Sequence, residues 1–240
     1  MQDYEKNLFH GSKMVVEHPL REKCRPENDF GQCFYSTEVL DLAKEWACQD
    51  GTAGVVSAYT INMAELSVIN LNTDEYHTLN WLGTILQYRC PSRLDDESSV
   101  AREYLIQNFA VDTSAADIVI GYRADDSYFR YAADYLYGRI GLDKLSEAMY
   151  LGKLGEQVAI QSERAFERLE FQDFYEVEAT YISRYQMRDK NARAAYRETI
   201  KGQIYMEKTL PIAQIIREGI KNDDPRLFKS IHHGRAGNVR

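Results

Sequence analysis

The apolar residues of this chain fall into short runs that suit β-strands and longer stretches with helical spacing, and the two kinds do not alternate regularly. Short apolar or alternating runs are typical of strands, whereas apolar residues that recur about every 3.6 positions bury one face of a helix. Regular alternation would indicate a doubly wound parallel sheet, so its absence predicts an α+β fold. With 240 residues, the chain is long enough to bury a core of its own.

The pattern divides the chain into a mixed body and a helical end. Strands are predicted over residues 7–12, 30–35, 54–61, 66–71, 117–122, 157–162 and 168–177. Helices are predicted over residues 39–47, 74–88, 100–109, 127–138 and 142–151, and again from about residue 178 onward. The apolar or alternating runs over residues 54–61 and 66–71, on either side of Asn62–Glu65, predict a hairpin. We therefore expect a first domain over residues 1–178 and a helical C-terminal segment over residues 179–240, divided at Pro211.

Composition and charge exclude several classes of protein. No stretch approaches 18 consecutive apolar residues, and the first thirty residues lack a basic start followed by an apolar run. We therefore expect a cytoplasmic protein with no membrane partner. The net charge is −8, although residues 172–240 carry 13 Lys and Arg against 9 Asp and Glu. The basic end, in which Tyr and Arg are interleaved, suits either an ordinary packed helix face or a nucleic-acid surface.

The cysteines and histidines do not predict a metal site. Cys24, Cys33, Cys48 and Cys90 have spacings that match no zinc, redox or disulfide pattern, so they are interpreted as isolated thiols. His232 and His233 lack a third ligand nearby in the sequence. The loop Asp95–Glu97 is typical of a solvated acidic surface. We expect no metal cofactor.

Two short segments each place polar groups at the end of an apolar strand, and no common nucleotide-binding or hydrolase motif is present. They are Leu8–Ser12, with His10-Gly11, and Phe30–Tyr35, which has the pattern Phe-Gly-x-x-x-Tyr before a helix. This order resembles the first elements of the ADP-ribosyltransferase fold of the poly(ADP-ribose) polymerase type. Over about residues 7–178 the chain is similar to a bacterial family catalogued as domain of unknown function 3990, which is grouped with those transferases and often occurs in toxin–antitoxin-like gene pairs.

The resemblance implies split antiparallel sheets around an NAD cleft, with NAD as the substrate. His10 would bind the adenosine ribose, the backbone of Gly11 would hold the nicotinamide carboxamide, and Tyr35 would stack on the nicotinamide ring. A second aromatic position is occupied here by Trp46, and a position where the pattern has serine is Ala43. The neighbouring NAD-binding positions implied by the resemblance are Ser12 and Phe34. Each of these side chains also suits a purely structural role in a strand or on a helix face.

The third element of that pattern is a Glu on a late strand, and here the matching strand carries both Glu156 and Gln157. Side chains alternate along a strand, so if Val158 and Ile160 lie in the core the catalytic face presents Gln157. Glu156 at the entry of the strand is the other candidate. The acidic pair Asp125 and Asp126, which follows the strand over residues 117–122, suits either a site that supplies charge or a helix N-cap.

The resemblance implies mono-ADP-ribosyl transfer from NAD to a macromolecular acceptor, with the protein as the toxin of a toxin–antitoxin-like pair. Without a catalytic carboxylate, elongation of a polymer is not expected. Three alternatives stay open: a catalytically weak module that binds NAD or a partner, an NAD glycohydrolase, and an RNA-directed toxin that uses the basic end. A small antitoxin-like protein is the expected partner, with residues 179–240 as its docking segment.

Overall fold

The computed structural model describes the chain except for residues 1–3, 92, 125, 152–154, 204–208 and 229–240. It is a mixed α and β structure with two sheets and several helices, which confirms the predicted α+β class. The chain forms two compact units. Unit 1 contains residues 1–70, 113–123 and 154–188, and unit 2 contains residues 71–112, 124–153 and 189–240. Each unit is described below by itself.

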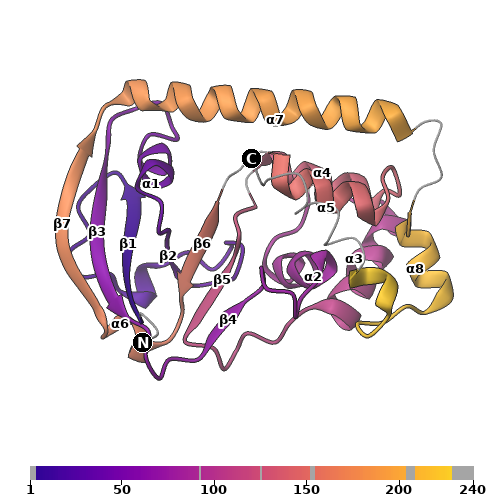
Figure 1. Cartoon of the computed structure of the whole chain (residues 1–240), viewed down its shortest axis with the longest axis horizontal. Helices are drawn as coiled ribbons and strands as arrows, with labels where there is room; N and C mark the ends of the chain where they lie inside the picture. The colour runs from indigo at the N-terminus through magenta and orange to yellow at the C-terminus, as the bar shows by residue number, and fades with distance from the viewer. Residues whose placement is uncertain (1–3, 92, 125, 152–154, 204–208, 229–240) are drawn as a thin grey trace. The chain divides into compact units, whose positions relative to one another are not determined.

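The first sheet of unit 1 has three antiparallel strands, with β3 in the centre between β1 and β7 (Figure 1). The strands are β1 (Glu5–Ser12), β3 (Gly54–Asn62) and β7 (Leu169–Val177). Leu8 on β1 lies opposite Tyr59 on β3, and both side chains are buried. All three strands fall where the apolar pattern predicts them.

The second sheet of unit 1 has four strands in the order β2-β6-β5-β4. They are β2 (Phe34–Ser36), β6 (Glu156–Ile160), β5 (Ile118–Tyr122) and β4 (Val68–Asn70). β6 pairs antiparallel with both of its neighbours, whereas β4 and β5 pair in parallel. The sheet therefore differs from the expected wholly antiparallel arrangement, because the long connection between β4 and β5 allows the chain to return in the same direction.

The prediction of a hairpin over residues 54–71 is wrong. Two strands are present near the predicted positions, but β3 belongs to the first sheet and β4 to the second. The residues between them turn the chain from one sheet to the other, with Glu65 in a left-handed backbone conformation at φ 63°. A local apolar pattern indicates that a segment is a strand and does not indicate which strand it pairs with.

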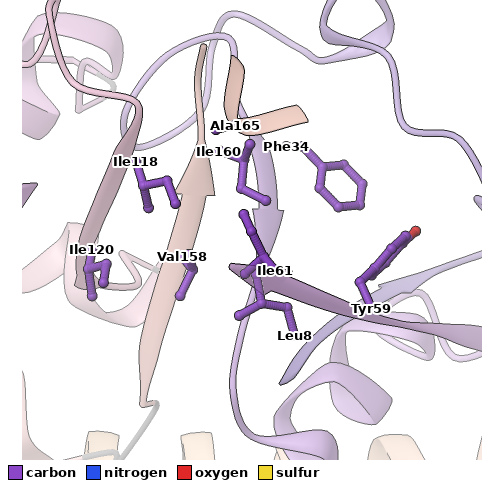
Figure 2. Packing of buried hydrophobic residues seen from close by; sticks show 9 residues of the cluster. All are labelled: Leu8, Phe34, Tyr59, Ile61, Ile118, Ile120, Val158, Ile160 and Ala165. Atoms are coloured by element: carbon purple, nitrogen blue, oxygen red, sulfur yellow. The ribbon is translucent and has the colours of Figure 1, made fainter. Parts of the chain in front are cut away.

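A hydrophobic core lies between the two sheets of unit 1 (Figure 2). Both sheets contribute buried side chains to it, and Figure 2 shows Val158 and Ile160 of the second sheet next to Ile61 and Leu8 of the first. The cluster consists of Leu8, Phe34, Tyr59, Ile61, Ile118, Ile120, Val158, Ile160 and Ala165. This burial determines which face of β6 is left for other contacts.

The two sheets are also joined through their backbones. Beyond the end of β2, Thr37 forms an isolated bridge with Phe9 of β1, with both N–H groups donating to the opposite carbonyl at 2.8 and 3.0 Å. The hydroxyl of Thr37 then accepts a hydrogen bond from the N–H of Val39 and precedes α1 (Leu40–Ala47). The bridge thus fixes the position of β1 relative to β2 and to the start of α1.

Helix α1 covers the face of the first sheet that points away from the core between the sheets. Ala43 and Ala47 pack with Val56 of β3 and Val177 of β7. The short helix α6 (Glu163–Phe166) follows β6, and Ser162 caps it by accepting a hydrogen bond from the N–H of Ala165. Unit 1 ends in the first residues of α7.

Unit 2 is built from helices. They are α2 (Thr78–Tyr88), α3 (Asp96–Phe109), α4 (Asp126–Leu136), α5 (Leu142–Leu151), α8 (Ile212–Glu218) and the larger part of α7 (Ile182–Gln203). Asp95 caps α3 by accepting a hydrogen bond from the N–H of Ser98, and Pro211 precedes α8. These elements confirm the helices that the periodicity predicts, including those beyond residue 178. Within the described part of the chain, no helix is both long and apolar enough to cross a membrane.

Candidate active site

His10 and Tyr35 lie in direct contact in unit 1. The Nδ1 atom of His10 is 2.7 Å from the backbone carbonyl oxygen of Tyr35. A carbonyl only accepts, so Nδ1 carries the proton and donates it, and Nε2 of the neutral ring is the hydrogen-bond acceptor. Burial lowers the pKa of His10, and the hydrogen bond to Tyr35 opposes that shift less strongly. His10 is therefore a neutral acceptor at neutral pH.

The hydroxyl of Tyr35 is engaged with the segment that precedes it. It accepts a hydrogen bond from the N–H of Phe30 at 2.8 Å and donates one to the carbonyl of Gly31 at 2.9 Å. Burial raises the pKa of this phenol above its ordinary range, so the hydroxyl stays protonated. The hydroxyl of Tyr35 thus holds the backbone of the preceding loop, at Phe30 and Gly31, in place.

Gln157 lies on the face of the second sheet that carries the Tyr35 side chain. Tyr35 pairs with Ala159 across β2 and β6, and Gln157 is two residues from Ala159 on the same face. The alternation predicted for β6 is present, since Val158 and Ile160 lie in the core on the opposite face. Gln157 is only 3% exposed, whereas Glu156 is exposed at the entry of the strand, opposite Tyr122.

The amide of Gln157 has a defined orientation. Its Nε2 donates to Oδ2 of Asp29 at 2.8 Å and approaches the carbonyl of Tyr122 at 3.4 Å. Both neighbours are acceptors, so the nitrogen must point toward them and Oε1 must point the other way. In the part of the chain that the structure describes, Oε1 accepts no hydrogen bond.

Asp29 is a site residue that the sequence reasoning missed. Its side chain is 5% exposed and lies against Gln157, which is 128 residues away in the sequence. It sits in a polar stretch without strand or helix periodicity, where a carboxylate is ordinarily solvated. Its position just before the Phe-Gly pair was the one signal that could have led to it.

Gly11 is required by the close approach of β1 and α1. A Cβ atom at this position would lie 2.0 Å from the carbonyl oxygen of Ala43 and 2.7 Å from the nitrogen of Ala47. The backbone groups of Phe9 point away from β3 toward Thr37, and those of Gly11, two residues along, point to the same side. The neighbouring Ser12 donates its hydroxyl to the carbonyl of Met14.

Phe34 packs in the core between the sheets and supports His10. Its ring centroid is 4.4 Å from that of His10, and its other ring neighbours are Tyr59 and Phe166. In this structure the Phe34 side chain is covered by protein, and its contribution is to hold the imidazole in place.

The ring of Trp46, on α1, is covered by a guanidinium group. The Cζ atom of Arg123 lies 5.1 Å from the centroid of the ring, and Nη2 of Arg123 donates to Gln49. The neighbouring Glu45 is paired with Arg188, and burial raises its pKa despite both arginines. Among the residues that the structure describes, the indole Nε1 of Trp46 and the Nη1 of Arg123 are buried and have no hydrogen-bond partner.

The acidic pair cannot be placed at the site. Asp125 lies outside the described residues, and Asp126 begins α4 in unit 2 with a side chain that is also outside them. In the basic end of the chain, Tyr196 is buried against Tyr131 with ring centroids 3.8 Å apart and donates its hydroxyl to Asp134. At this position the interleaved aromatic residue forms part of a packed face.

Metal-binding chemistry finds no support in the described residues. They contain no group of three or more His, Cys, Asp or Glu side chains placed to hold an ion, and all four cysteines are free thiols. Burial raises the pKa of Cys33 to about 12, so this thiol is not a nucleophile at neutral pH.

The fold and the site define a mixed α and β protein with a polar cluster at the junction of two sheets. Residues 6–171 match the model of a family described as protein of unknown function (DUF3990), and the chain belongs to that family. Neither a curated protein nor a solved structure matched the chain significantly.

Proposed function

We propose that this protein binds NAD at the cluster around His10, Tyr35 and Gln157 and transfers its ADP-ribosyl group to a macromolecular acceptor. The observation that carries the proposal is the hydrogen bonding of the cluster itself. The donors of His10 and Gln157 are occupied within the protein, at 2.7 and 2.8 Å. Within the described part of the chain, this leaves two acceptors to meet a ligand, Nε2 of His10 and Oε1 of Gln157. The hydroxyl groups of a ribose are donors that match them.

The backbone of Gly11 suits the carboxamide of nicotinamide. This group offers one donor and one acceptor, and the N–H and C=O of a strand residue that point away from the sheet supply the complementary pair. Beyond its bridge to Thr37, β1 has Gly11 in this orientation. The absence of a side chain here also lets α1 approach the strand closely.

The chemistry proposed is cleavage of the bond between nicotinamide and the ribose. The electron pair of that bond leaves with nicotinamide, positive charge develops on the ribose, and a nucleophile of the acceptor then bonds to the anomeric carbon and loses its proton to solvent. An amide oxygen at residue 157 stabilises the cation through its dipole and accepts from a ribose hydroxyl, but it carries no net charge. This is the reason to propose a single transfer and not the growth of a polymer.

Incubation of the purified protein with labelled NAD, with and without cell lysate, tests the proposal. We expect lysate-dependent label on macromolecules, and loss of that label in His10→Ala. The matched control is His18→Ala, because His18 is an exposed histidine of the same unit. Free nicotinamide without transferred label would mean an NAD glycohydrolase. NAD binding by calorimetry without either product would mean a binding module, and no binding at all would refute the proposal.

The toxin role is tested separately by expression in a bacterial host. If NAD-dependent transfer is toxic, the wild-type protein should arrest growth, and His10→Ala should be tolerated at an equal protein level. Arrest by both proteins would separate toxicity from the NAD site and favour a partner-binding or RNA-directed activity. A small protein that restores growth and copurifies with the wild type would be the expected antitoxin-like partner.

A further inference from the structure

The side chain of Asp29 is buried at the polar cluster of unit 1. It is a buried carboxyl group beside the neutral side chain of Gln157, with 2.8 Å between Oδ2 and Nε2. Burying a carboxylate is costly unless strong hydrogen bonds offset the lost hydration. The loop that carries Asp29 is held by the Tyr35 hydroxyl through the backbones of Phe30 and Gly31.

The contact decides which end of the Gln157 amide faces the ligand. A primary amide can turn over and exchange its oxygen and nitrogen at little cost if its surroundings do not discriminate. Here the carboxylate of Asp29 and the carbonyl of Tyr122 accept on one side only, which holds the nitrogen there. A reversed amide would present an N–H group toward a developing cation and would oppose its formation.

The carboxylate also changes the electron distribution of the amide. A charge-assisted hydrogen bond to the amide nitrogen polarises the group and increases the negative charge on its oxygen. The carboxylate of Asp29 thus supplies part of the negative charge that the neutral side chain of Gln157 lacks.

We propose that Asp29 is a positioning residue for the cleavage step, which acts through Gln157 by fixing Oε1 toward the ribose and increasing its negative charge. This inference rests on the proposed function, since it assigns a role in the same reaction. Because Asp29 acts through the amide of Gln157 in this assignment, we expect a larger effect on the transition state than on the bound state.

The first test is Asp29→Asn, which keeps an oxygen that can accept from Gln157 but removes the charge. We expect kcat for nicotinamide release to fall about tenfold or more, with KM changed by less than about threefold. The matched control is Asp117→Asn. Asp117 is another largely buried Asp of unit 1, which accepts hydrogen bonds from Ser67 and Ser162 and has no contact with Gln157. The Asp117→Asn variant should have a lower melting temperature than the wild type and an unchanged kcat when folded.

The second test exchanges the two groups. Gln157→Glu alone places a second carboxylate against Asp29, and two adjacent carboxylates do not both ionise readily. In the double variant Asp29→Asn with Gln157→Glu, the amide and the carboxylate are swapped and can bond again. We expect the double variant to recover at least the wild-type kcat, and to exceed both single variants. A double variant no better than Asp29→Asn, or a wild-type kcat in Asp29→Asn, would overturn the inference.

A nuclear magnetic resonance measurement separates this inference from the proposed function. The side-chain amide of Gln157, identified by its loss in Gln157→Glu, should shift in Asp29→Asn and remain in place in Asp117→Asn. If the wild type neither binds nor cleaves NAD, the proposed function fails, and the Asp29 role in that reaction fails with it even if the amide shifts. If the wild type cleaves NAD but neither kcat nor the amide signal responds to Asp29→Asn, only the present inference fails.

Discussion

At the scale of single residues, the polar groups of the site form hydrogen bonds within the protein and leave particular acceptor atoms for a ligand. His10 gives its proton to a backbone carbonyl, Tyr35 uses its hydroxyl on its own loop, and Gln157 gives its amide nitrogen to Asp29. Each side chain therefore has a fixed orientation before any ligand arrives. Such preorganisation lowers the cost of binding and of reaching the transition state.

The Trp46 ring provides a residue-scale prediction, because the guanidinium group of Arg123 lies over this ring, 5.1 Å from its centroid. A cation over an indole contributes about 0.5–2 kcal/mol. If the ring binds nicotinamide, Arg123→Gln removes a competitor, and the affinity for NAD measured by calorimetry should rise about two- to thirtyfold.

The control for this prediction is Arg184→Gln, since Arg184 lies over the Tyr181 ring at 4.7 Å in the same unit and has no contact with Trp46. It should leave the affinity for NAD unchanged. An unchanged or weaker affinity in Arg123→Gln would assign Trp46 to packing.

The sequence could predict Gln157 but not Asp29, for a physical reason. Strand alternation is a local rule, so once Val158 and Ile160 are placed in the core the face of Gln157 follows. The contact with Asp29 joins segments 128 residues apart, and nothing in the local pattern of residues 25–30 encodes it. The same holds for Arg123 and Trp46, which meet only after the sheet and α1 are assembled.

At the scale of elements, the close approach of β1 and α1 ties the site to one glycine. The carbonyl oxygen of Ala43 occupies the space that a Cβ atom at residue 11 would need. The strand and helix could separate only by moving α1, which carries Trp46. A side chain at residue 11 would therefore change the position of Trp46 by moving the backbone of α1.

Gly11→Ala should therefore destabilise the protein. We expect the free energy of unfolding to fall by about 1–3 kcal/mol, the usual cost of forcing extra atoms into a packed contact. Urea denaturation followed by circular dichroism measures the change. Ser12→Ala, at the next position of β1, should cost less, because it removes only one exposed hydrogen bond to Met14. A urea midpoint equal to that of the wild type in Gly11→Ala would show that β1 and α1 can move apart at little cost.

The elements also show what periodicity can and cannot predict. Strands and helices were found near their predicted places because burial of one face imposes a period on each element. The pairing of β4 was missed, since Val68–Asn70 carries the same alternation whichever sheet it joins. Pairing is decided by contacts across the core, where Ile118 and Ile120 of β5 are available to a neighbouring strand.

At the scale of the whole molecule, each unit has its own buried residues and a histidine whose pKa is lowered by burial. In unit 2, His77 is 2% exposed, and its ring lies 5.8 Å from that of Phe109 and 5.1 Å from that of Phe228. Burial lowers the pKa of His77 to about 4, and the neighbouring Asn222 opposes this weakly. In unit 1 burial lowers the pKa of His10 as well.

These shifts predict that stability decreases as the solution becomes acidic. In the unfolded chain His77 has a pKa of about 6.5, whereas in the folded protein its pKa is about 4. Between these two pH values the unfolded chain therefore binds a proton at His77 that the folded protein does not bind. The stabilisation is complete above about pH 6.5 and is lost as pH falls toward 4, by on the order of 3 kcal/mol. Carboxyl groups such as Asp224, with a pKa of about 2, act only at lower pH.

Thermal unfolding between pH 7 and pH 4 checks this prediction. His77→Phe keeps an aromatic ring between Phe109 and Phe228 and should reduce the slope of melting temperature against pH. The difference between the two slopes isolates His77 from His10. An unchanged slope in the variant would show that His77 accepts its proton as readily folded as unfolded.

The two halves of the site differ in how evolution can alter them. His10 is held by the carbonyl of residue 35, an atom that every amino acid supplies, so that contact survives replacement of the side chain. The contact between Asp29 and Gln157 joins two side chains, so replacement of one residue changes the partner of the other. Lineages should therefore exchange residues 29 and 157 together, and family members with Glu at position 157 should carry a neutral hydrogen-bonding residue at position 29.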